Sequence, residues 1–156
     1  MKCSLTVVLA GLIAASSFAF AQPETVTVEP FVGGGAAFGV PGGDPSLTLQ
    51  GGADQLLGPL ALRGVFEIDA SGVASLGVDV IHHFSTSREL APYVGGGLAL
   101  ALTFPAYEVH ALGGLEAFVS SGVSLFGEVQ PAYRVFVDID DGLGANVRLG
   151  ANYRFD

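Results

Sequence analysis

The chain of 156 residues is apolar and acidic, with a formal net charge of −9 and a mean hydropathy of +0.56. Six basic residues against fifteen acidic ones exclude a nucleic-acid-binding protein, because phosphates are bound by a basic surface. The hydropathy is high for a soluble domain, yet no segment after residue 21 approaches the uninterrupted apolar length of about 18 residues that a membrane-spanning helix requires. A helical membrane protein is therefore excluded as well.

The N-terminus has the pattern of a cleavable signal peptide. Lys2 precedes the apolar stretch 5–15, and Ala19-Phe20-Ala21 supplies the small-x-small pattern that signal peptidase accepts. The apolar stretch is too short for an uncleaved membrane anchor, which is the alternative. We therefore expect residues 1–21 to be removed on export and residues 22–156 to form one domain.

Turn chemistry divides the exported part into eight predicted strands. Glycine, proline, serine and aspartate gather at regular intervals, and these residues tolerate the dihedral angles of tight turns. The predicted strands are 26–39, 47–56, 60–70, 73–84, 93–104, 107–119, 123–137 and 143–155. An even number of regularly spaced strands predicts an all-β, antiparallel up-and-down meander that closes into a barrel.

The last predicted strand alternates between apolar and polar residues without a break. One parity carries Ala145, Val147, Leu149, Ala151, Tyr153 and Phe155, and the other carries Asn146, Arg148, Gly150, Asn152 and Arg154. A transmembrane β-barrel needs this pattern, because lipid contacts one face of each strand and a polar lumen contacts the other. A secreted soluble β-sandwich with its apolar face inside is the alternative.

Charged and polar residues gather on one parity of the other strands too. In a barrel these residues would face the lumen: Arg63, Glu67, Asp69, Asp79, His83, Glu108, His110, Glu116, Glu128, Gln130, Arg134, Arg148 and Arg154. An eight-stranded barrel is only wide enough for side chains to fill it, and buried charges persist only when they are paired. We therefore expect an ion-paired network that plugs the lumen instead of lining an open pore.

Aromatic residues of the opposite parity fall near the strand ends. With both termini on the periplasmic side, Phe38, Phe104 and Tyr107 would lie at the outer rim, and Phe84, Tyr153 and Phe155 at the periplasmic rim. Two such belts are typical of transmembrane barrels, because aromatic rings favour the depth of the lipid headgroups. His82 shares this outward parity, so we expect it near the periplasmic interface.

One hexapeptide occurs twice, with a single Phe-to-Tyr difference. Pro30-Phe31-Val32-Gly33-Gly34-Gly35 is echoed by Pro92-Tyr93-Val94-Gly95-Gly96-Gly97, at the openings of the first and fifth predicted strands. Four strands separate the copies, which suggests either an ancestral duplication or convergence of glycine-rich strand openings. Neither copy has the lysine or the strand-to-helix setting of a phosphate-binding loop.

Taken together, these features resemble the small outer-membrane β-barrels of the OmpA transmembrane-domain, OmpX and OmpW type. The resemblance covers residues 22–156 and includes the ending Asn152-Tyr153-Arg154-Phe155, which is similar to the aromatic-terminated strand that the barrel-assembly machinery reads. Asp156 departs from the usual terminal aromatic residue. The resemblance implies a location in the outer membrane, with lipid, periplasmic chaperones and the assembly machinery as partners.

The sequence predicts neither a catalytic site nor a cofactor or metal site. Asp79, His83, Glu108 and His110 could share a metal, but a satisfied lumen network explains them better. The segment 138–142 has a faint likeness to a calcium loop, although its glycine arrives one residue early, and an Asp-Gly hairpin turn explains it better. We expect a non-enzymatic structural or interaction protein, with a narrow pore or small-molecule conduit as the alternative.

Overall fold

The computed structural model describes residues 28–84, 89–136 and 142–155. The predicted signal peptide, residues 1–21, lies outside these ranges, as does most of the calcium-loop-like segment 138–142. Among the described residues, no helix is long and apolar enough to cross a membrane.

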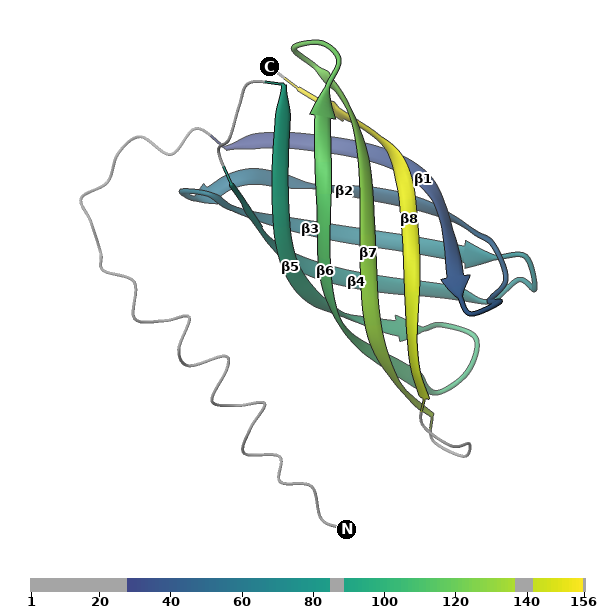
Figure 1. Ribbon diagram of the computed structural model, residues 1–156. Helices are drawn as coiled ribbons and strands as arrows, with labels where there is room; N and C mark the ends of the chain where they lie inside the picture. The colour runs from purple at the N-terminus through teal and green to yellow at the C-terminus, as the bar shows by residue number, and fades with distance from the viewer. Residues whose placement is uncertain (1–27, 85–88, 137–141, 156) are drawn as a thin grey trace.

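Eight antiparallel strands form one closed barrel in which every strand pairs with its neighbours in the sequence, and β8 returns to pair with β1 (Figure 1). The strands are β1 (Glu29–Val40), β2 (Ser46–Leu57), β3 (Leu60–Asp69), β4 (Ala74–His83), β5 (Leu90–Ala101), β6 (Ala106–Phe118), β7 (Val123–Phe136) and β8 (Gly142–Arg154). The predicted fold class is confirmed. Because the sheet closes on itself, the alternative of a two-sheet sandwich is wrong.

The barrel has two distinct ends. Phe31 pairs with Arg154, so β1 begins and β8 ends at one end, which we call the terminal end. The turns after β1, β3 and β5 lie at the other end, which we call the loop end. The connections between strands that the structure describes in full are short, between two and five residues.

Strand boundaries agree with the predicted ones to within three residues, and β5 differs most. It runs from Leu90 to Ala101, whereas the sequence predicts 93–104. The amide of Leu102 still donates to the carbonyl of Ala74 at 2.8 Å, after which the chain leaves the ladder ahead of Pro105. Proline cannot donate a backbone hydrogen bond, which favours an early end.

The outward face carries no charged side chain on any of the eight strands as described. The burial pattern alternates along each strand, and the outward positions are aliphatic, aromatic, glycine or proline except for Gln55 and His82. Both exceptions lie near the terminal end, where Leu60 pairs with Leu57 and His82. Gln55 has a φ of 58° within a bulge of β2, so it departs from regular strand geometry.

On the inward face, three large aromatic residues lie opposite a glycine of the neighbouring strand. Phe31 pairs with Gly52, Tyr93 with Gly114, and Phe126 with Gly150. A ring folded over a glycine fills the space that a Cβ atom would occupy, so a wide side chain fits inside a narrow barrel. The first two pairs involve the repeated hexapeptide, whose aromatic residue is paired with a glycine in both β1 and β5.

Adding a methyl group to Gly114 should destabilise the barrel. A Cβ atom there would lie 2.6 Å from the Gly127 carbonyl oxygen and from the Tyr93 ring. We expect Gly114→Ala to lower the free energy of unfolding by about 1–3 kcal/mol, as overpacking does elsewhere. Denaturant titration followed by circular dichroism measures this change.

Gly64→Ala is the matched control, because a Cβ atom there would lie 3.6 Å from its nearest neighbour, the Gly51 carbonyl oxygen. Equal unfolding midpoints for the two alanine variants would contradict the role assigned to the Tyr93–Gly114 pair.

Candidate functional site: the polar lumen

The centre of the lumen is crossed by Arg63. Its Nε and Nη2 atoms donate to Asp79 Oδ2 at 2.9 and 2.7 Å. On the other side, Nη1 and Nη2 donate to the two carboxylate oxygens of Glu128 at 2.9 and 3.0 Å. Asp79 is the direct cross-strand partner of Arg63, whereas Glu128 reaches it from β7, across the barrel. One buried guanidinium thus ties β3 and β4 to β7.

Glu128 also binds two other groups in this central layer. Arg148, its cross-strand partner on β8, donates from Nη1 to Glu128 Oε1 at 2.8 Å. The hydroxyl of Tyr93 donates to Glu128 Oε2 at 2.9 Å. Arg148 extends the layer to Glu67, with Nη2 3.2 Å from Glu67 Oε2. The carboxylate of Glu128 is therefore fully satisfied although it is buried.

A second layer lies at the terminal end and is centred on Arg154. Its guanidinium donates to Asp54 at 2.9 Å, to Glu116 at 2.8 Å and to the hydroxyl of Ser124 at 2.8 Å. The same guanidinium lies 4.7 Å from the centre of the Phe118 ring, within cation–π range. This single residue near the end of β8 thus contacts β2, β6 and β7.

Three further residues complete the terminal-end layer. Asn152 donates to Glu116 at 3.0 Å and accepts a hydrogen bond from Gln50 at 2.6 Å. The His83 ring lies 3.9 Å from Asp54 and 3.8 Å from Glu116, measured from ring nitrogen to carboxylate oxygen.

The third layer lies at the loop end. Arg134 donates from Nε to Glu108 at 2.7 Å and from Nη2 to Asn146 at 3.2 Å. His110 links this layer to the centre, because its Nε2 lies 2.7 Å from Asp79 and its Nδ1 lies 3.3 Å from Glu108. The Arg134 side chain is 44% exposed, whereas Arg63 is 3% exposed. Exposure therefore rises from the centre toward the loop end.

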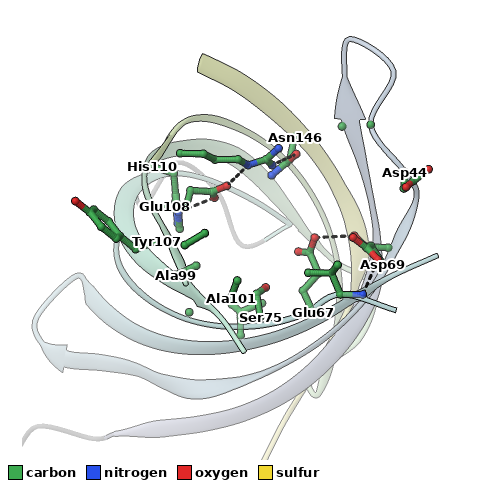
Figure 2. Close-up of a pocket in the computed structure, with 18 of the residues that line it drawn as sticks. Asp44, Glu67, Asp69, Ser75, Ala99, Ala101, Tyr107, Glu108, His110 and Asn146 are labelled. Atoms are coloured by element: carbon green, nitrogen blue, oxygen red, sulfur yellow. Dashed lines mark hydrogen bonds and ion pairs between the residues drawn. The ribbon is translucent and has the colours of Figure 1, made fainter. Parts of the chain in front are cut away.

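A cavity of about 250 Å³ opens at the loop end (Figure 2). It exists because the inward positions of β4 and β5 that line it carry small residues, namely Ser75, Gly77, Ala99 and Ala101. A second cavity, of about 20 Å³, lies at the terminal end between Phe31 and Arg154. The two cavities share no lining residue, and the Arg63–Asp79 pair lies between them.

Eleven of the thirteen residues expected in the lumen network interact there with another charged side chain. They are Arg63, Glu67, Asp79, His83, Glu108, His110, Glu116, Glu128, Arg134, Arg148 and Arg154. Gln130 is buried, but its amide has no hydrogen-bond partner among the described residues. Asp69 differs from the expectation, because its carboxylate accepts hydrogen bonds from Ser71 and Val73 in the β3–β4 turn.

Sequence reasoning missed several members of these layers, notably Asp54, Gln50, Ser124 and Tyr93. The sequence of β2 does indicate an inward polar face, because Ser46, Thr48 and Gln50 alternate with leucines. Asp54 continues this parity but stands next to the bulge at Gln55, which interrupts the alternation. Tyr93 looks apolar in the sequence pattern, and its burial and its hydrogen bond to Glu128 show that it points inward.

Of the six aromatic residues expected at the rims, Phe104 is the exception to an outward position, because it lies between β5 and β6, lines the loop-end cavity and stacks on Phe136 with ring centres 6.2 Å apart. Phe38, Phe104 and Tyr107 lie toward the loop end, Phe84, Tyr153 and Phe155 lie toward the terminal end, and all are between 40% and 50% exposed. His82 packs edge-on against Phe84, with ring centres 4.8 Å apart.

No protein-family profile matches the sequence, and no curated protein does. Solved structures show the fold. A de novo designed transmembrane β-barrel has a TM-score of 0.60 and 20% identity, covering 86% of this chain and 100% of its own. The N-terminal β-barrel domain of Pseudomonas aeruginosa OprF has a TM-score of 0.61 and 15% identity, covering 81% and 97%. Neisserial surface protein A has a TM-score of 0.54 and 17% identity, covering 81% and 94%. The chain therefore has the fold of small transmembrane barrels.

Removing one charge from the central layer should be costly. Glu128→Gln leaves Arg63 and Arg148 without their shared carboxylate, and breaking a buried pair typically costs about 3–5 kcal/mol. We expect a loss of stability near that range, measured by denaturant titration of the folded protein.

Arg134→Gln serves as the comparison, because it breaks an ion pair at the exposed loop end, where such pairs contribute about 0–1 kcal/mol. A cost for Arg134→Gln equal to that for Glu128→Gln would contradict the graded burial described above.

Proposed function

We propose that this chain is a non-enzymatic outer-membrane β-barrel protein with a plugged polar lumen and a structural or interaction role in the cell envelope. The observation that carries the proposal is the uncharged outward face of all eight strands, combined with ion-paired charges inside. This distribution is the inverse of a soluble protein, and it is the distribution that a hydrocarbon environment requires.

The exposed apolar side chains support this location. Leu47, Leu98 and Leu143 are between 61% and 84% exposed, and they belong to strands on different sides of the barrel. Soluble proteins rarely expose contiguous apolar patches larger than a few hundred square ångströms. Acyl chains would cover this face without any partner protein, and the five outward aromatic residues near its two edges suit the headgroup regions.

The ion-pair layers support a plugged lumen. Arg63, Asp79 and Glu128 meet across the barrel with side chains at most 3% exposed. The carboxylates they contribute are engaged by arginine, histidine or tyrosine, which suits a structural network. A narrow pore is the second candidate, because cavities lie on both sides of this layer and joining them would require only that it open.

Export and assembly follow from the same proposal. Residues 1–21 would direct the chain across the inner membrane. Periplasmic chaperones would then carry it to the barrel-assembly machinery, for which the ending 152–155 is the recognition segment. In the folded barrel, Tyr153 and Phe155 contact each other at the outward terminal rim, with ring centres 5.1 Å apart.

A charged residue on the outward face should make folding into a lipid bilayer less favourable, and the cost should be greatest near the middle of the bilayer. We expect Leu149→Arg, near the middle of β8, to cost about 2–4 kcal/mol of folding free energy in lipid vesicles. Leu143→Arg lies beside the start of β8 at the loop end and should cost about 0–1 kcal/mol. Equal costs at both positions would contradict a bilayer centred on the strands.

Membrane fractionation tests the outer-membrane location, and planar-bilayer conductance tests the plugged lumen. We expect the protein in the outer-membrane fraction, with different electrophoretic mobility before and after boiling, as folded barrels resist detergent. In planar bilayers the purified protein should give no reproducible ion steps. Release into the soluble fraction would overturn the membrane location, whereas reproducible conductance steps would overturn the plug and favour the pore.

A further inference from the structure

The ring of His110 lies between two carboxylates of the lumen, with one at each of its nitrogens. Nε2 lies 2.7 Å from Asp79 Oδ1, and Nδ1 lies 3.3 Å from Glu108 Oε1. The His110 side chain is buried, so bulk water does not take the place of either contact. Each ring nitrogen therefore faces an anionic oxygen that a proton on that nitrogen would stabilise.

The register of the strands places these groups together. Asp79 on β4 and His110 on β6 are both direct partners of Gly97 on β5. A Cβ atom on Gly97 would overlap Asp79 Oδ1 and would lie 2.9 Å from His110 Nε2. The absence of a side chain at this position lets the acid and the ring meet over β5. Glu108 lies on the same face of β6, two residues before His110.

The other charged groups around this cluster come from two further strands. Arg63 on β3 lies behind Asp79, with Nη2 2.7 Å from Oδ2, and Arg134 on β7 lies behind Glu108, with Nε 2.7 Å from Oε2. Beside the ring, β5 presents small inward residues such as Ala99 (Figure 2), and the direct partner on β7 is an alanine. The imidazole thus bridges two arginine–carboxylate pairs, one in the central layer and one at the loop end.

The balance of charge points to a cation at this position. Among the described residues, the ion pairs of the central and loop-end layers join three arginines to four carboxylates, namely Arg63, Arg134 and Arg148 to Glu67, Asp79, Glu108 and Glu128. One negative charge is in excess, and buried charge is tolerated only when it is paired. An imidazolium at His110 makes the count four against four.

The number of hydrogen-bond donors leads to the same conclusion. A neutral imidazole has one N–H group and one lone pair, whereas an imidazolium has two N–H groups. A neutral ring would turn its lone pair toward one of the two carboxylates, which repels it. An imidazolium makes a favourable charge-assisted contact on both sides. Charge balance and geometry therefore require the same second proton.

His83 provides a contrast within the same lumen. Its ring nitrogens lie 3.9 Å from Asp54 and 3.8 Å from Glu116, beyond hydrogen-bond distance. Glu116 also accepts hydrogen bonds from Ser124 and Asn152, so its oxygens are satisfied without the ring. The His83 side chain is 23% exposed, compared with 4% for that of His110. Neither contact of His83 requires a second proton.

We propose that His110 is an obligatory cation that joins the loop-end layer to the centre of the lumen, and that the barrel loses stability when this ring loses its second proton. His110 lines the loop-end cavity, which gives protons a route to the ring from that end of the barrel. The pH at the loop end would then control how firmly the two layers are held together. This regulation goes beyond the proposed structural role and requires only the closed barrel.

Nitrogen NMR of isotope-labelled histidine tests the charge directly, with the folded protein in detergent micelles at about pH 8. An imidazole in water titrates at about pH 6.5, so an unconstrained ring is neutral under these conditions. We expect two protonated nitrogens at His110, but one protonated and one bare nitrogen at His82 and at His83. The spectra of His82→Gln and His83→Gln assign the signals, so no variant of His110 has to fold. A bare nitrogen at His110 would overturn the proposal.

The pH dependence of stability tests the role of the proton. Two carboxylates bind the imidazolium only in the folded barrel, so its contribution is complete below about pH 6.5 and is lost as the pH rises above that value. We expect the folding equilibrium constant, from denaturant titration, to fall by up to about tenfold per pH unit between about pH 7 and about pH 9. His110→Gln has no such proton to lose, so it should be less stable at about pH 7 and should show no such fall.

His83→Gln is the matched control, because it removes a lumen imidazole whose contacts lie beyond hydrogen-bond distance. This variant should keep the pH dependence of the unmodified protein. An equilibrium constant that does not change over this pH range would overturn the proposal. A fall that persists in His110→Gln, or that disappears in His83→Gln, would also overturn it, because the proton would then belong to another group.

Discussion

The two-residue alternation of each strand is the constraint on which the rest of the structure depends. Because successive side chains point to opposite faces, a closed sheet sorts every strand residue into an inner or an outer set. Among the described strand residues of this chain, the outer set has no charge, and the inner set holds all of the arginines and acids. A shift of one residue in any register would exchange the two sets on that strand, so the pairing of the strands is strongly specified.

The inner set shows how a narrow barrel accommodates both rings and charges. The rings of Tyr93 and Phe126 lie over glycines of the neighbouring strand, which leaves the centre for long guanidinium and carboxylate groups. Arg63 and Arg154 each bind acids from different strands, so the ion pairs hold opposite walls of the barrel together. The inward residues of β4 and β5 near the loop end are small, so they do not fill the lumen there and the loop-end cavity remains.

The fold could be predicted from the sequence because apolar and polar residues alternate along the strands and each connection is rich in turn-forming residues. The inward position of Arg148 follows from its neighbours Val147 and Leu149 alone. Partners could not be predicted in this way, because they depend on the stagger of strands around the barrel: Arg63 meets Glu128 across the lumen, 65 residues away. Tyr93 and Asp54 were missed since one looks apolar and the other stands beside a bulge, and Asp69 was placed in the network although turn amides lie closer to its carboxylate.

The central claim is that the aliphatic face contacts hydrocarbon while the arginines are enclosed. Paramagnetic relaxation in lipid nanodiscs tests this claim most directly, with a spin label on the lipid tails compared against a water-soluble gadolinium chelate. The account predicts that Val78, Leu98 and Leu149 are relaxed by the lipid label and protected from the chelate, with the Arg63 guanidinium protected from both. Relaxation of the three aliphatic side chains by the water-soluble chelate, with no effect of the lipid label, would contradict it.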